Sequence, residues 1–225
     1  MTGWSLDPAP LGARVEALRN RIADAGGDPE AVELVAVTKG FGPEVALAAR
    51  AIGLVELGEN YAQELVAKAP LVAEVGPVRW HAIGRLQRNK VRSLVGIVGL
   101  WQSVDRADLA AEIAKRAPGA EVLVQVNVSD EAQKGGCAPA EVADLVRRSG
   151  DLGLVVRGLM TVGRTGAPAE ARAGFATLRS LADGLALPVR SMGMSGDLEA
   201  AVAEGATMVR VGSALFGPRP PRDPA

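Results

Sequence analysis

Eight short apolar runs alternate with helical segments along this chain, and this alternation most limits how the chain can fold. The runs are rich in β-branched residues, and apolar residues recur at helical spacing between them. Strands that alternate with helices form βαβ units and a parallel sheet. The expected strands are 32–39, 54–59, 79–84, 97–103, 121–128, 154–160, 190–195 and 207–212. The expected helices between them are 43–52, 61–75, 87–94, 106–116, 139–148, 168–185 and 196–204.

Eight βα repeats with short connections predict an α/β protein with a closed (β/α)8 TIM barrel. An open doubly wound sheet is the alternative. A further amphipathic helix over residues 10–25 precedes the first strand. No break in composition divides the chain, so we expect a single domain over residues 1–225, with an ordered core from about residue 10 to residue 217. A Pro-rich tail over residues 218–225 follows the core.

Composition excludes several classes of partner. The 225 residues are 48% hydrophobic and carry a net charge of −1. The chain therefore lacks the excess of basic residues that is typical of proteins that bind nucleic acid or an anionic membrane. The single cysteine, Cys137, rules out an internal disulfide, and we expect an exposed loop thiol there. No apolar stretch is long enough to span a membrane, and the N-terminus lacks the pattern of a signal peptide. We therefore expect a cytoplasmic protein.

Lys39 ends the first apolar run and stands at the carboxyl end of the first expected strand. In a (β/α)8 barrel, this end of the strands carries the active site. Twenty of the 25 basic residues are arginine and five are lysine. An arginine could have supplied a positive charge at position 39, so the choice of lysine needs another reason. A lysine amine can lose its proton and form a Schiff base, whereas arginine stays protonated. We interpret Lys39 as a carbonyl-binding lysine for pyridoxal phosphate; the alternative is a strand-end lysine that extends into water.

Two segments near the C-terminus have the features of a phosphate site. Ser195 precedes an expected helix start, and Gly212 and Ser213 follow the last expected strand. Glycine allows close approach of backbone N–H groups, serine offers a hydroxyl, and a helix start favours an anion. Barrels frequently bind phosphate with the loops after strands 7 and 8. The alternative for each segment is a helix cap or a tight turn.

Arg210 lies two residues before Gly212 and shares its side of the last strand. A buried arginine needs an acceptor, and the pyridine nitrogen of pyridoxal phosphate is one that arginine binds. A carboxylate such as Glu59 is the alternative partner. His81 is the one histidine of the chain and invites a general-base role. We favour a structural role in which His81 bonds to a neighbouring loop, and we assign no catalytic residue.

Several ordered segments resemble the pyridoxal phosphate homeostasis protein family, which shares the barrel of the alanine racemase N-terminal domain. The resemblance covers residues 34–39, 58–64, 80–90, 125–129, 134–135, 158–160, 191–197 and 209–217. It implies that Lys39 forms the Schiff base, that Ser195, Gly212 and Ser213 hold the phosphate, and that Arg210 meets the pyridine nitrogen. It also implies that Asn60 lies beside the cofactor. Lys134 matches a lysine in a loop that the family links to cofactor transfer.

Two functions follow from this resemblance. The favoured one is a carrier that holds pyridoxal 5'-phosphate and acts in its intracellular homeostasis, with little or no turnover and with apo enzymes that use the cofactor as partners. The alternative is a fold-type III enzyme such as an amino-acid racemase, which needs a second base from an additional β domain that we do not find in this sequence. We expect a monomer, because no second domain is apparent and the outer faces of the helices should be polar. We expect no metal, because no Cys/His cluster is present. Desolvation is expected to lower the pKa of Lys39.

Overall fold

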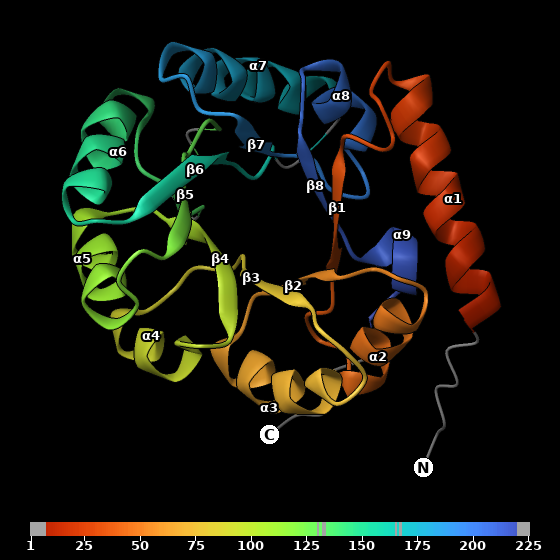
Figure 1. The fold of residues 1–225 in the computed structure, drawn as a ribbon. Helices are drawn as coiled ribbons and strands as arrows, with labels where there is room; N and C mark the ends of the chain where they lie inside the picture. The colour runs from red at the N-terminus through yellow and green to blue at the C-terminus, as the bar shows by residue number, and fades with distance from the viewer. Residues whose placement is uncertain (1–7, 130, 132–133, 165, 167, 220–225) are drawn as a thin grey trace.

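Eight parallel strands form a closed barrel in which β8 pairs with β1, and helices cover the outside (Figure 1). The computed structural model describes residues 8–129, 131, 134–164, 166 and 168–219. The strands are β1 (Glu33–Val37), β2 (Glu56–Glu59), β3 (Arg79–Ala82), β4 (Val98–Val104), β5 (Glu121–Gln125), β6 (Val155–Met160), β7 (Val189–Ser191) and β8 (Met208–Val211). The predicted (β/α)8 barrel is confirmed, and the open-sheet alternative is wrong because the edge strands β1 and β8 pair with each other.

A helix follows each strand, and all of the expected helices are present within a few residues of their expected bounds. The helices are α1 (Pro8–Asp24), α2 (Pro43–Ala51), α3 (Ala62–Ala73), α4 (Arg88–Leu94), α5 (Ala107–Arg116), α6 (Val142–Asp151), α7 (Pro168–Gly184), α8 (Leu198–Ala203) and α9 (Ser213–Phe216). A single 3₁₀ turn, Pro139–Glu141, leads into α6.

The N-terminal helix α1 takes the place that a longer eighth helix would fill. It packs against α2, α8 and α9, on the outer side of β8 and β1 (Figure 1). The helix α9 that follows β8 has only four residues and cannot cover this part of the barrel alone. Gly26, with φ of 85°, lets the chain leave α1, while the Gly27 N–H donates to Ile22 O at 3.0 Å.

The structure differs from the sequence prediction at the last two strands. Strand β7 ends at Ser191 instead of residue 195, and α8 begins at Leu198 instead of residue 196. Helix α9 was not expected, because four residues are too few to show helical periodicity. Residues 192–197 therefore form a loop at the barrel mouth. Of the expected tail, residues 218–219 are described and 220–225 lie outside the described residues.

Apolar side chains pack on both surfaces of the barrel wall, because alternate strand residues point to opposite sides. The larger layer lies between strands and helices and includes Trp101, Phe175 and Phe216. A smaller cluster is formed by Val35, Leu100, Leu123, Met160 and Met208. Their parity along the strands places this second cluster inside the barrel, as in other (β/α)8 proteins.

Cys137 is buried, so the expected exposed thiol is wrong. Its N–H donates to Gln125 O at 2.9 Å, and it pairs with Val126 beside the end of β5. Burial raises the pKa of the Cys137 thiol to about 11. The group is therefore a protonated thiol at neutral pH and not a reactive surface thiolate.

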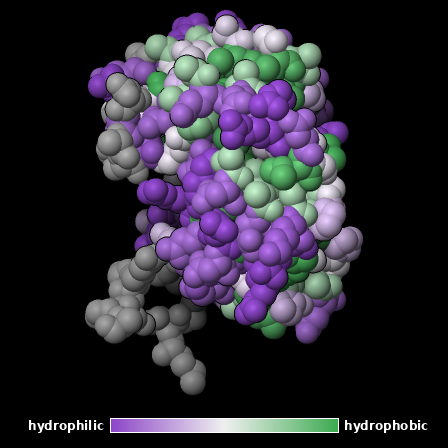
Figure 2. All heavy atoms as spheres, turned by 90° about the vertical axis from the view of Figure 1, so that its left-hand side faces the viewer, coloured by the Kyte–Doolittle hydropathy of each residue, from purple (hydrophilic) through white to green (hydrophobic). Residues whose placement is uncertain are grey.

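The side of the barrel that carries α5 and α6 is largely hydrophilic, with apolar residues scattered among polar ones (Figure 2). Charged side chains pair along α6, where Arg147 bonds to Asp144 and Asp151 at 2.7 Å each. Among the described residues, no helix combines the length and the apolar character that crossing a lipid bilayer requires.

Replacing Gly158 by alanine tests the close approach of β6 and β7. The added Cβ would lie 2.6 Å from the carbonyl carbon of Val189, so the two strand backbones would have to separate. We expect Gly158→Ala to lower the free energy of unfolding by about 1–3 kcal/mol in urea denaturation. Gly12→Ala in α1 is the control, since its Cβ meets nothing within 4 Å and alanine favours a helix. Equal midpoints for Gly158→Ala and the parent would refute this close packing.

Candidate functional site

A cavity of about 450 Å³ opens at the carboxyl-terminal end of the barrel, a size typical of small-molecule sites. All six residues that the sequence predicted as cofactor-binding residues line it: Lys39, Asn60, Ser195, Arg210, Gly212 and Ser213. Six further residues complete its wall: Val37, Ile83, Val162, Met194, Gly196 and Arg219. The closed barrel thus gathers around one cavity residues that are as far apart in the chain as Val37 and Arg219.

Lys39 follows β1 and is partly buried at the wall of this cavity. Burial lowers the pKa of Lys39 from its usual value, and the positive charges of Arg219 and Arg210 lower it further, while Glu59 acts in the opposite sense. The predicted direction of the shift is confirmed. A lowered pKa increases the fraction of neutral amine, which is the form that attacks a carbonyl carbon.

The loops after β7 and β8 meet at one end of the cavity. The Ser195 hydroxyl accepts a hydrogen bond from the Ala214 N–H at 3.2 Å, which ties the first loop to the start of α9. A Cβ at Gly212 would lie 3.1 Å from Val37 O, so glycine fits best at this crossing of β8 and β1. Hydroxyls and backbone N–H groups therefore stand at the place that the sequence predicted for a phosphate.

Asn60 follows β2 and borders the same cavity. Its backbone is crossed closely by the loop after β3, where a Cβ on Gly84 would lie 2.7 Å from Asn60 Cα. Glycine at position 84 permits this crossing, because it has no Cβ to clash with the Asn60 backbone.

Arg210 is buried with 4% of its surface exposed, and its guanidinium has two acceptors in the barrel interior. One is the hydroxyl of Ser191 at 2.7 Å, and the other is the carbonyl oxygen of Thr161 at 2.6 Å. Burial lowers the pKa of Arg210 to about 10, so the group remains a cation at neutral pH. The alternative that Arg210 pairs with Glu59 is wrong, because that carboxylate bonds to other groups.

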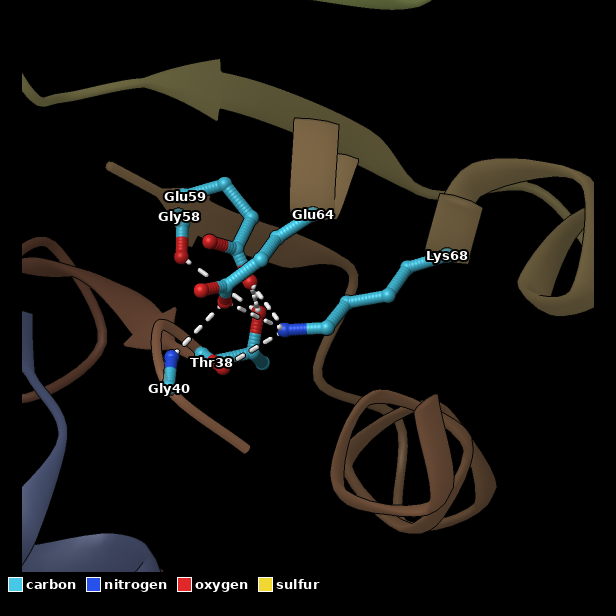
Figure 3. A network of polar contacts seen from close by, with 6 residues as sticks. All are labelled: Thr38, Gly40, Gly58, Glu59, Glu64 and Lys68. Carbon is cyan, nitrogen blue, oxygen red and sulfur yellow. Dashed lines mark hydrogen bonds and ion pairs between the residues drawn. The ribbon is translucent and has the colours of Figure 1, made fainter. Parts of the chain in front are cut away.

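Glu59 belongs to a buried ion-pair network that flanks Lys39 (Figure 3). Lys68 Nζ lies 2.5 Å from Glu59 Oε1 and donates to Thr38 O at 2.8 Å. The Thr38 hydroxyl donates to the same Glu59 oxygen at 2.7 Å. Glu64 accepts from the Gly40 N–H at 2.8 Å and from Lys68 Nζ at 3.3 Å. The residues on both sides of Lys39 in the chain are therefore fixed by groups on β2 and α3.

Sequence reasoning missed Lys68 as a part of this site. The side chain of Lys68 is 4% exposed, although lysine is rarely buried without a partner. It stands on the apolar face of α3, beside Leu65, Ala69 and Val72, and four residues after Glu64. A lysine at an apolar helix position was the signal that could have found it.

Arg219 is the second cation that the sequence did not assign to the site. It follows α9 and lines the cavity, so the start of the expected tail contributes to the wall. Its side chain approaches Gly40, where a Cβ would lie 3.2 Å from Arg219 Cδ. The cavity therefore holds two arginines and one lysine, a charge balance that suits an anionic ligand.

His81 and Lys134 lie outside the cavity wall. His81 bonds to Glu56 and Gln102 at 2.5 Å each, so the expected contact with a neighbouring loop is wrong and its partners lie on the strands β2 and β4. Lys134 forms an ion pair with Glu131 and donates to Gly163 O at 2.5 Å. A role of Lys134 in cofactor transfer stays a prediction.

Fold and site together define a class of protein. A sequence profile of the family "Alanine racemase, N-terminal domain" matches residues 7–220, so the barrel belongs to that family. The "Pyridoxal phosphate homeostasis protein" of Pseudomonas aeruginosa is 43% identical over 216 residues, which cover 92% of this chain and 94% of the relative. The chain therefore belongs to the pyridoxal phosphate homeostasis protein family, as its sequence motifs predicted.

Two solved structures agree with this assignment. A protein of unknown function from Bifidobacterium adolescentis has a TM-score of 0.88 and 34% identity, covering 95% of this chain and 98% of its own. PipY of Synechococcus elongatus PCC7942, solved with PLP bound, has a TM-score of 0.78 and 34% identity, covering 89% of this chain and 100% of its own.

Removing Lys68 is expected to destabilise the protein strongly. Lys68→Met leaves the Glu59 carboxylate buried without its cation, which costs about 3–5 kcal/mol in the free energy of unfolding. Urea denaturation measures this loss. The double variant Lys68→Met/Glu59→Gln removes the unpaired charge as well and is expected to recover part of it. A single variant as stable as the parent would show that the pair contributes nothing.

We expect Arg219 to contribute, together with burial, to the lowered pKa of Lys39. Because the charge of Arg219 lowers the pKa of Lys39, Arg219→Ala should raise this pKa and shift the pH profile of amine reactivity to higher pH. The rate of Lys39 acylation in cofactor-free protein, followed by mass spectrometry from pH 6 to 10, measures the shift. Arg219→Lys keeps the charge and is expected to retain the parental profile. Identical midpoints in all three proteins would contradict the electrostatic role.

Proposed function

We propose that this protein binds pyridoxal 5'-phosphate as a Schiff base to Lys39 and serves in intracellular homeostasis and carriage of the cofactor, with little or no turnover. The observation that carries the proposal is the gathering of Lys39, Arg210 and the Ser195–Gly212–Ser213 group around one cavity. PipY, a relative that shares this fold, was solved with PLP bound, which supports the same ligand here.

The donor set fits the three polar parts of this cofactor. Lys39 offers an amine whose lowered pKa favours attack on the aldehyde carbon, with release of water as the C=N bond forms. Ser195 and Ser213 offer hydroxyls, and Gly212 allows backbone N–H groups to approach the phosphate. Arg210 offers N–H donors for the pyridine nitrogen, and Asn60, which lines the same cavity, would lie beside the bound cofactor. A cationic partner keeps that nitrogen unprotonated and makes the ring a weaker electron sink.

Carriage is favoured over racemisation because the cavity lacks a second base. Among the described residues that line it, the titratable side chains are Lys39 and the two arginines, Arg210 and Arg219. Arginine stays protonated and is a poor proton acceptor. The match to the homeostasis protein of Pseudomonas aeruginosa also extends over nearly its whole length. An amino-acid racemase remains the second candidate, because the barrel family is that of alanine racemase.

The proposed function also includes a cellular compartment, an oligomeric state and partners. We infer a cytoplasmic monomer whose residues 1–225 form one domain and which hands the cofactor to apo enzymes. The face shown in Figure 2, which carries α5 and α6, is largely hydrophilic and in this respect supports a monomer. The single cysteine supports a reducing compartment.

The absorption spectrum after addition of pyridoxal phosphate and removal of the excess tests the proposal. We expect an imine band in the parent, loss of this band in Lys39→Ala, and attachment to Lys39 after borohydride reduction. Lys115→Ala, which removes an exposed lysine on α5, is the matched control and should keep the band. No band in the parent would refute the proposal, and efficient racemisation of amino acids by the pure protein would favour the enzyme.

A further inference from the structure

A line of buried polar side chains crosses the barrel interior from the cavity to the opposite mouth. Arg210 NH1 lies 2.7 Å from Ser191 Oγ, and Ser191 Oγ lies 2.7 Å from Gln102 Oε1. Gln102 Nε2 lies 2.5 Å from His81 Nδ1, and His81 Nε2 lies 2.5 Å from Glu56 Oε2. The first four residues are buried, with 0–4% of their surfaces exposed. Four consecutive hydrogen bonds therefore join the cavity wall to Glu56.

The chemistry of Arg210 fixes the direction of every bond in this line. A guanidinium has donors only, so Ser191 must accept from it, and the single proton of Ser191 is then donated to the Gln102 carbonyl oxygen. The Gln102 amide nitrogen must in turn donate to His81 Nδ1. The ring proton of His81 is thereby placed on Nε2, which donates to the Glu56 carboxylate.

We propose that Ser191, Gln102 and His81 are positioning residues that orient the Arg210 guanidinium toward the cofactor, with His81 held as the neutral Nε2–H tautomer. This inference rests on the proposed function in one respect, the role of Arg210 beside the pyridine ring. It assigns a task to the one histidine of the chain, which lies outside the cavity and three hydrogen bonds from Arg210.

The surroundings of His81 favour its neutral form. Burial lowers the pKa of His81, and the charges of Arg79 and Arg210 act in the same sense, against the opposing effect of Glu56. A second ring proton would set an N–H of His81 against the N–H of Gln102. Turning the amide to accept that proton would then give Ser191 two donors, and its own proton would lose its acceptor. The protonation state of His81 is therefore linked to the hydrogen bond that orients the Arg210 guanidinium.

The far end of the line already contains its own cation. The possible ligand atoms of Glu33, Glu56 and His81 lie within 4.8 Å of one another, a spacing that also suits a metal ion. Arg79 lies beside them, 3.9 Å from Glu56 and paired with Glu121. The contact between His81 and Glu56 has the length of a hydrogen bond, and the Arg79 guanidinium lies near the same Glu56 oxygen.

Nitrogen NMR on protein labelled with ¹⁵N-histidine tests the line without the cofactor. Because His81 is the one histidine in the sequence, the spectrum contains a single pair of imidazole nitrogens. In the cofactor-free parent at pH 7, we expect a protonated Nε2 and an unprotonated Nδ1. Gln102→Met should move the Nδ1 signal, because this nitrogen loses its donor. An Nδ1–H tautomer or a doubly protonated ring in the parent would overturn the inference, whether or not pyridoxal phosphate binds.

A comparison of two buried serines distinguishes a positioning role from a general effect on stability. Ser191→Ala cuts the line next to Arg210, whereas Ser149→Ala on α6 removes a buried hydroxyl that has no partner among the described residues. We expect Ser191→Ala and Gln102→Met to weaken pyridoxal phosphate binding about tenfold and to shift the pH titration of the imine band. Ser149→Ala should leave both unchanged.

The ¹⁵N signals of His81 also show whether a ligand bound beside Arg210 affects the histidine near the other end of the line. Addition of pyridoxal phosphate to the parent should shift the His81 signals, and Ser191→Ala should abolish this response. Parental affinity and imine titration in both Ser191→Ala and Gln102→Met would refute the positioning role. Absence of an imine band in the parent is a separate result that refutes the proposed function, while the tautomer still decides the hydrogen-bonded line.

Discussion

The pairing of β1 with β8 is the contact on which the candidate site depends. It aligns residues 33–36 with residues 208–211 and thereby closes the barrel. Closure brings Lys39, at the end of the first strand, beside Arg210 and the turn at Gly212 and Ser213. The electrostatic effect of Arg210 on Lys39 and the close crossing of Gly212 over Val37 both follow from this one pairing.

Buried charge is organised differently on the two sides of Lys39. On the α3 side, Lys68 and Glu59 neutralise each other and hold the backbone at Thr38. On the β8 side, the two hydrogen-bond acceptors of Arg210 are neutral, and the charge of Asp197 acts on it without a direct ion pair between the described residues. A buried ion costs free energy unless it is paired or bound to a ligand. A ligand that accepts hydrogen bonds would therefore stabilise Arg210, whereas Lys68 is already paired with Glu59.

The barrel of this chain matches both the alanine racemase N-terminal domain family and the pyridoxal phosphate homeostasis proteins, so the fold alone does not decide between an enzyme and a carrier. Within the described cavity wall, a single amine stands among arginines, hydroxyls and apolar side chains. The proposal of a carrier rests on this set of groups, because a cationic wall suits an anionic aldehyde and arginine is a poor proton acceptor. The positioning role that we propose for the hydrogen-bonded line from Arg210 to Glu56 would extend the binding site into the barrel interior.

The sequence by itself favoured the (β/α)8 class and, with the family resemblance, predicted six of the twelve residues that line the cavity, because strand–helix alternation places the ends of all strands at one face. Lys39, Ser195 and Arg210 were predictable since each has a residue type that stands out at its position. Tertiary structure alone decided the partners: that Glu59 pairs with Lys68 and not with Arg210, that Arg219 reaches the cavity, and that His81 faces Gln102. These contacts join elements far apart in the chain, and no local pattern of residues encodes which buried donor meets which acceptor.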